Sequence, residues 1–146
     1  MARVTIANKL IKKIRRAVLS QFTTNFKGEL IGKNLWKNLE VFEYHVNTYP
    51  SDEIITVPIG FETDFASIPR FCWPLISPID NHAKSAVIHD FCYFHGLYNR
   101  RISDKIFREG LRVLKIEPWK IWFMYNFVRI CGWYKWNKMR KKEASV

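Results

Sequence analysis

The sequence predicts an α+β fold: a small antiparallel β-hairpin or sheet over residues 36–58, followed by a three-helix, mostly antiparallel bundle over residues 81–136. Two observations lead to this prediction. β-Branched and aromatic residues alternate in part up to residue 58, and beyond residue 81 apolar residues recur at helical spacing between helix start and stop signals. A small, mostly helical body is the alternative. With 146 residues, 48% of them hydrophobic, the chain can bury one ordinary core, which excludes a disordered protein.

The net charge of +11 is concentrated at the two ends of the chain. Residues 1–16 hold six basic residues and no acid, residues 135–143 hold five basic residues and one acid, and the middle is close to neutral. We therefore divide the chain into a basic N-terminal arm (residues 1–24), a single α+β domain (25–136) and a basic C-terminal tail (137–146). Such ends favour non-specific contacts with nucleic acid or with lipid phosphates, so the domain must carry any specific chemistry.

The N-terminal arm places apolar residues at approximately helical spacing with Lys and Arg between them. This pattern predicts a basic amphipathic helix, which would dock on its own domain or on a partner, or lie on a membrane surface. The arm has neither the uninterrupted apolar stretch nor the small-residue cleavage site of a secretory signal peptide.

Two strands are expected over residues 36–48 and 53–58, with the turn at residues 49–52 (Tyr-Pro-Ser-Asp). A long loop follows, because Pro74 and Pro78 prevent a continuous helix. It gathers Thr63, Asp64 and Ser67 beside apolar anchors, and long loops in compact domains are often functional. The alternative is that these polar side chains only cap local backbone groups.

The first two helices are expected to form an antiparallel hairpin. One runs from Asn81, as N-cap, to His95, where Gly96 supplies a stop signal. The next runs from Ser103, as N-cap, to about Leu114. The loop between them is short, so the two helices should lie side by side.

A third helix is expected to begin at Pro118 and to run to about Trp136. It holds eight Trp, Phe and Tyr residues, yet Arg129 lies near its centre. A charge there argues against a transmembrane helix, so we expect a core helix or an interfacial one.

His89 and Asp104 are the candidate catalytic pair. Counted from the hairpin turn at about 1.5 Å per residue, they lie at similar height on neighbouring helices. Asp104 also shares a stripe with Phe107 and Leu111, the stripe expected to face the neighbouring helix. A carboxylate that holds the imidazole through Nδ1 would fix its tautomer and leave Nε2 to take a proton from water. We therefore predict a general base, oriented by Asp104.

Asp90 is the candidate metal ligand. It lies about 100° further around the helix and faces the preceding loop, where Asp64 and loop carbonyls would complete the oxygen ligands of a hard cation such as calcium. The alternative is that Asp104 only holds the hairpin together, while Asp90 pairs with Arg100 or Arg101.

Other metal and cysteine chemistry receives less support. A zinc or manganese phosphohydrolase could use four side chains, His82, His89, Asp90 and Asp104, but His82 lies seven residues before His89, near the start of the helix. The three cysteines, Cys72, Cys92 and Cys131, lack paired spacing, so they indicate neither a disulfide framework nor a zinc site.

The segment His-Asp-Phe-Cys-Tyr at residues 89–93 resembles the His-Asp-x-Cys-Tyr helix motif of secreted phospholipases A2. In its looser His-Asp-x-x-Tyr form it is similar to that of the parvoviral phospholipase domain. The resemblance implies that His89 is the general base, that Asp90 binds calcium, and that Asp104 on the next helix orients the histidine. The chain departs from these families because it has no disulfide framework and no glycine-rich calcium loop before the helix.

A wider resemblance covers about residues 36–136. VPIGFETDFASIPR (residues 57–70), HDFCY (89–93), SDKIFREGL (103–111) and an aromatic helix follow one another in the order seen in an uncharacterised family of small proteins encoded by tailed bacteriophages and prophages. The resemblance implies a phage origin, with a location in the host cytoplasm during infection or in the virion.

Two functions fit these observations. The first is a hydrolase in which His89, oriented by Asp104, activates water against an ester, with calcium at Asp90 and Asp64. A phospholipid is the leading substrate, because the basic arm and the aromatic helix suit a membrane surface. The second is a non-enzymatic virion, tail or assembly protein whose aromatic and basic surfaces bind other phage structural proteins. Nucleic acid is expected to bind only non-specifically, through the basic termini.

Overall fold

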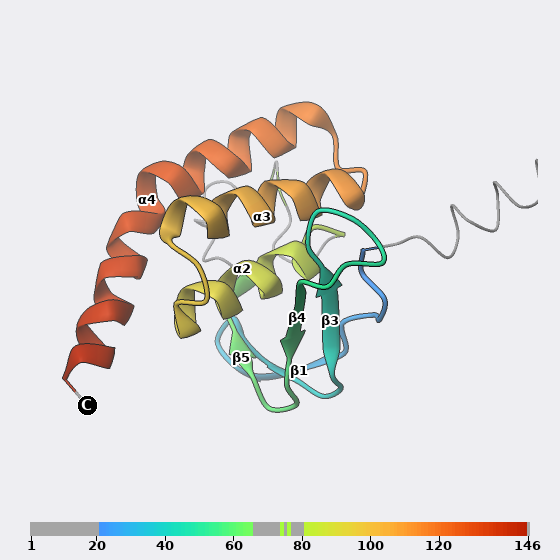
Figure 1. Ribbon diagram of the computed structural model, residues 1–146. Helices are drawn as coiled ribbons and strands as arrows, with labels where there is room; N and C mark the ends of the chain where they lie inside the picture. Colours follow the sequence, from blue (N-terminus) through green and yellow to red (C-terminus); the bar gives the residue numbers. More distant parts are fainter. Residues whose placement is uncertain (1–20, 66–73, 75, 77–80, 146) are drawn as a thin grey trace, which may run out of the picture.

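The computed structural model describes residues 21–65, 74, 76 and 81–145. Within these ranges the chain forms five strands followed by three helices, so the predicted α+β class is confirmed (Figure 1). Residues 1–20, which hold most of the predicted N-terminal helix, lie outside the described residues. The same is true of Ser67, Cys72 and Pro78.

The strands form two separate antiparallel sheets. β1 (Gly28–Gly32), β2 (Leu35–Asn38) and β5 (Glu62–Thr63) make one sheet in the order β1-β2-β5, and β3 (Phe42–His45) pairs with β4 (Ile54–Val57) in the other. The predicted hairpin is therefore present; its connection covers residues 46–53, which include the predicted turn residues 49–52, and has a cis bond before Pro50.

The predicted strand over residues 36–48 is two strands in different sheets, which corrects the sequence analysis. The chain changes sheets after Asn38, which is fully buried. Its backbone pairs with Phe61 and Gly60, and its side-chain amide donates to the carbonyl of Pro58 at 3.0 Å. These bonds anchor the end of β2 beside the start of the loop that contains β5.

α2 (Ala83–His95) is the central helix, packed between the strands and the other two helices (Figure 1). All nine residues from 85 to 93 are buried. A helix buried on every side must find a partner for each polar group that it carries. The C-terminal stop at Gly96 is confirmed, with φ at +57°, whereas the N-cap is His82 rather than Asn81.

α3 (Arg100–Val113) begins three residues before the predicted start. Asn99, not Ser103, is its N-cap, because the Asn99 side chain accepts a hydrogen bond from the amide of Ile102 at 2.9 Å. Ser103 is buried inside the helix, and its hydroxyl donates to the Asn99 carbonyl. Only four residues separate α2 from α3, so the two helices form the predicted hairpin.

α4 (Pro118–Ala144) begins at the predicted proline and continues well beyond Trp136, so most of the basic C-terminal segment is helical. None of the helices in the described part of the chain combines the length and apolar content that a bilayer crossing requires. The C-terminal half of α4 also closes the end of α2. There Arg140 donates to the carbonyls of Tyr93 and Phe94 at 2.7 and 2.8 Å.

Two glycines bring the three helices close together. A methyl group on Gly110 of α3 would overlap the Ser85 hydroxyl of α2, which donates to the Phe107 carbonyl. A methyl group on Gly132 of α4 would lie 2.7 Å from Tyr93 Oη. The close approach at Gly132 places α4 against the candidate catalytic pair.

Candidate functional site

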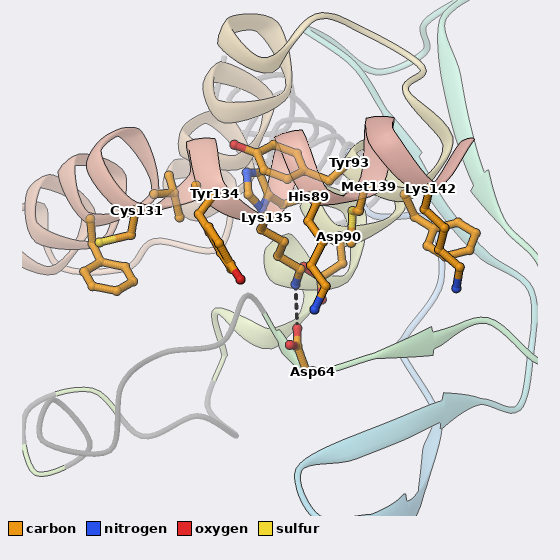
Figure 2. Close-up of a pocket in the computed structure, with 14 residues that line it drawn as sticks. Asp64, His89, Asp90, Tyr93, Cys131, Tyr134, Lys135, Met139 and Lys142 are labelled. Carbon is orange, nitrogen blue, oxygen red and sulfur yellow. Dashed lines mark hydrogen bonds and ion pairs between the residues drawn. The ribbon is translucent and has the colours of Figure 1, made fainter. Parts of the chain in front are cut away.

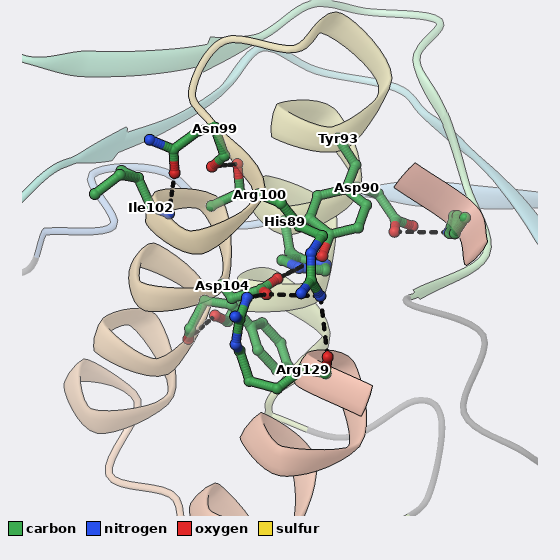
Figure 3. Close-up of polar contacts among 12 residues, drawn as sticks. His89, Asp90, Tyr93, Asn99, Arg100, Ile102, Asp104 and Arg129 are labelled. Atoms are coloured by element: carbon green, nitrogen blue, oxygen red, sulfur yellow. Dashed lines mark hydrogen bonds and ion pairs between the residues drawn. The ribbon is translucent and has the colours of Figure 1, made fainter. Parts of the chain in front are cut away.

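His89 and Asp104 face each other across the α2–α3 interface, as predicted (Figure 3). His89 Nε2 lies 2.8 Å from Asp104 Oδ1, and the two side chains are 3% and 0% exposed. The structure corrects the expected atom, because Nε2 and not Nδ1 meets the carboxylate. Nε2 is the ring nitrogen farther from its own backbone, so it is the one that reaches the neighbouring helix.

Asp104 is the centre of a buried polar cluster. Tyr93 Oη donates to Oδ1 at 2.5 Å, Arg129 Nη1 donates to Oδ2 at 2.5 Å, and Arg100 Nη1 lies 3.6 Å from Oδ2. Burial alone would raise the pKa of Asp104, but the hydrogen bonds from His89, Tyr93 and Arg129 outweigh it and lower the pKa. The carboxyl group is therefore ionised and accepts every one of these bonds.

The ionised carboxylate determines the histidine tautomer. Because Asp104 can only accept, His89 Nε2 carries a proton, and in the tautomer that this selects Nδ1 is the acceptor. Nδ1 is buried and makes no hydrogen bond to the described residues. The ring packs against Tyr93 and Phe107, with centroids 4.1 and 5.0 Å away. A buried acceptor without a partner costs about 1–3 kcal/mol, so this nitrogen is the place where a water or a substrate group would bind.

Asp90 points away from Asp104 and toward Asp64, as expected. The ammonium group of Lys135 lies between the two carboxylates. Lys135 Nζ of α4 is 2.9 Å from Asp90 Oδ1 and 2.7 Å from Asp64 Oδ1 (Figure 2). The hydroxyl of Thr63 donates to Asp90 Oδ2 at 2.6 Å. Among the described residues, the salt-bridge partner of Asp90 is thus Lys135 rather than Arg100 or Arg101, and Arg100 instead approaches the carboxylate of Asp104.

This ion pair is charged throughout the neutral pH range. Burial alone would raise the pKa of Asp90, but the charge of Lys135 and the hydrogen bond from Thr63 lower it to about 2. Burial would also lower the pKa of Lys135, yet the charges of Asp90 and Asp64 raise it above its usual value.

The oxygen atoms around Asp90 do not fit calcium in this arrangement. Both carboxylate oxygens of Asp90 already accept hydrogen bonds, and the Lys135 ammonium lies where a metal shared with Asp64 would sit. In the described ranges no three His, Cys, Asp or Glu side chains are grouped so that they could hold a metal, and this includes the set with His82. The calcium site stays a prediction, which requires Lys135 to move.

A cavity of about 550 Å³ connects the two clusters. His89, Asp90 and Lys135 contribute to its wall (Figure 2). The rest of the wall includes apolar side chains and two further lysines, among them Phe94, Phe127, Val128, Met139, Lys138 and Lys142. The site therefore combines an imidazole nitrogen that has no hydrogen-bond partner among the described residues, an ammonium group and apolar surface.

A family model described as "Protein of unknown function (DUF1353)" matches residues 36–128, well over half of the chain. The protein belongs to this family. The DUF1353 match includes all four predicted site residues, Asp64, His89, Asp90 and Asp104. It ends before Arg129 and Lys135. The comparison with curated proteins and the comparison with solved structures found no match.

The sequence analysis missed three residues of the site. Tyr93 carries a signal, since it lies four residues after His89 and therefore on the same face of α2. Arg129 was considered only as a charge that opposes a membrane crossing, and nothing in the sequence pairs Lys135 with Asp64 or Asp90.

Cys92 of the motif is not a nucleophile candidate, because burial raises the pKa of its thiol to about 12.

Proposed function

We propose that this protein is an ester hydrolase in which His89 is the general base and Asp104 positions it. One observation carries the proposal: Asp104 holds Nε2 of a buried histidine that lines a cavity, while Nδ1 has no hydrogen-bond partner among the described residues. A histidine that only joined two helices would not need a cavity beside it. The resemblance to the phospholipase A2 motif, stated above, supports the same roles.

The reaction follows from the protonation states. His89 Nδ1 takes a proton from a water molecule, and the water oxygen forms a bond to the carbonyl carbon of the ester. The resulting imidazolium is stabilised by the negative charge of Asp104, which already accepts from Nε2. When the ester C–O bond breaks, the imidazolium returns the proton to the leaving oxygen, so the products are an acid and an alcohol.

A phospholipid is the proposed substrate. The cavity offers apolar side chains to an acyl chain and the ammonium groups of Lys138 and Lys142 to an anionic headgroup. The basic termini and the exposed aromatic residues of α4 would hold the protein on an anionic membrane surface. The phospholipase resemblance implies calcium as the metal, with Asp90 and Asp64 as its ligands, and binding there would require Lys135 to leave its place between the two carboxylates.

The proposed source is a tailed phage or prophage, and the proposed location is the host cytoplasm during infection or the virion. The order of motifs along residues 36–136 supports this origin.

The test is hydrolysis of mixed phospholipid vesicles by the purified protein, with calcium and with a chelator. We expect release of fatty acid that falls by about 10²-fold or more in His89→Ala, the lower end of what a general base contributes. His95→Ala is the matched control, because this exposed histidine lies on the same helix outside the cavity. No release by the wild-type protein in either condition, or full activity of a folded His89→Ala variant, refutes the proposal.

The second candidate is a virion or assembly protein without enzymatic activity. A specific observation favours it: α4 exposes a series of large apolar side chains, Trp119, Trp122, Ile130, Trp133 and Tyr134. Aromatic residues are enriched at protein interfaces, so other phage structural proteins are the proposed partners. Stoichiometric retention in purified particles supports this role, and loss during particle purification contradicts it.

A further inference from the structure

Lys135 lies where the sequence analysis expected a metal ion. Its ammonium group is held by Asp64 and Asp90, which belong to two separate segments of the chain. An ammonium group has three N–H donors, and these carboxylates use two of them. The described residues show no further acceptor for Lys135, although the residue lines the cavity together with His89. As far as the described residues go, one charged donor of Lys135 is therefore left for a molecule in the cavity.

We propose that the Lys135 ammonium is the resident cation of this site: it replaces a metal between Asp64 and Asp90 and stabilises the oxyanion formed during hydrolysis. This inference rests on the proposed hydrolase function. As the water oxygen bonds to the carbonyl carbon, the π pair of the C=O bond moves to the carbonyl oxygen, which accepts from Lys135. When the ester C–O bond breaks, that pair re-forms the C=O bond. Lys135 keeps all its protons throughout.

The surroundings of Lys135 hold it in place before any substrate arrives. Asp90 is buried and is itself fixed by the Thr63 hydroxyl, which in turn accepts a hydrogen bond from the amide of Phe65 at 3.1 Å. A donor that is already oriented needs no reorganisation when charge develops on the substrate. Asp64, Asp90 and Thr63 are therefore positioning residues, and Lys135 is the group that contacts the reacting oxygen.

The first test compares the rates at which the protein hydrolyses mixed phospholipid vesicles in the presence of a chelator and in the presence of calcium. We expect the wild-type protein to be equally active in both, and Lys135→Met to lose about 10²-fold or more in kcat. Lys135→Arg should recover part of the loss, because it keeps the charge. Lys141→Met is the matched control on the same helix, since the Lys141 side chain is exposed outside the cavity. Strict dependence of the wild-type protein on calcium, or full activity of Lys135→Met in chelator, overturns the proposal.

Lys135→Met leaves Asp90 buried without its counter-charge, so the variant can fail to fold. The double variant Lys135→Met/Asp90→Asn removes both charges and keeps the test of kcat possible. We expect it to fold, as circular dichroism would show, and to be as slow as the single variant. A folded double variant with wild-type kcat refutes the role of Lys135.

A calcium titration gives a readout that does not depend on activity. The wild-type protein should not bind calcium at about 1 mM, a concentration that fills weak protein sites. Lys135→Ala, which removes the ammonium group from between the two carboxylates, should bind it. Calcium binding by the wild-type protein that disappears in Asp90→Asn would show that Lys135 is not the resident cation. Absence of any turnover would refute the proposed function and the role of Lys135 in it, while the titration would still decide which cation occupies the site.

Discussion

Gly132→Ala tests whether the contact of α4 with Tyr93 supports the His89–Asp104 pair. The added methyl group would lie 2.7 Å from Tyr93 Oη, too close for any real contact, whereas the nearest ring carbons are 3.6 Å away. Tyr93 is fully buried and its hydroxyl donates to Asp104 at 2.5 Å, so the hydroxyl can move only by giving up this bond.

The magnitude follows from two opposing contributions. A hydrogen bond to a charged acceptor contributes about 1.5–3 kcal/mol to the free energy of unfolding. Replacing glycine by alanine inside a helix contributes about 1 kcal/mol in the stabilising direction. We therefore expect Gly132→Ala to destabilise the protein by about 0.5–2 kcal/mol.

The sign should reverse once the hydroxyl is gone. In Tyr93→Phe the overlap with the new methyl group disappears, so Gly132→Ala added to this variant should stabilise the protein by up to about 1 kcal/mol. Urea unfolding of the wild-type protein, both single variants and the double variant, followed by circular dichroism, gives the coupling free energy of the cycle. If Gly132→Ala changes stability equally in the two backgrounds, the contact between α4 and Tyr93 Oη does not exist as described.

Three further predictions concern charge and capping. Asp104→Asn should lower the initial rate of ester hydrolysis by about 10²- to 10⁴-fold, because an amide no longer specifies the tautomer of His89; a folded variant with the wild-type rate would contradict this role. Asp90 has a folded-state pKa of about 2 against 3.8 in the unfolded chain, so the folded state binds fewer protons. This difference contributes about 2 kcal/mol that is present above about pH 4 and lost as the pH falls toward about 2. Urea unfolding across that range should show a smaller loss for Asp90→Asn with Lys135→Met than for the wild-type protein, and equal losses would exclude Asp90 as the cause. Asn99→Ala should reduce the free energy of unfolding by about 1 kcal/mol, because the N-cap hydrogen bond is lost. An unchanged urea midpoint would show that Asn99 does not cap α3 and would favour Ser103 as the N-cap.

The sequence predicted two helix boundaries correctly, the end of α2 and the start of α4. Gly96 ends α2 in the left-handed conformation, and Pro118 begins α4, because each acts through its own φ angle. The N-cap of α3 was misplaced because Asn99 and Ser103 both have side chains that can cap a helix, and the choice depends on where the preceding turn ends.

The sequence by itself determined the α+β class, the helical hairpin and the meeting of His89 with Asp104, because helix periodicity and a short loop are enough to place two side chains at the same height. Only the tertiary structure decided what surrounds them. Arg129 and Lys135 belong to α4, which follows the helical hairpin in the chain. No local sequence pattern indicates which carboxylate a basic residue of α4 will contact. Gly132 allows α4 to approach Tyr93 closely, and Lys135, three residues further along α4, contacts both Asp64 and Asp90.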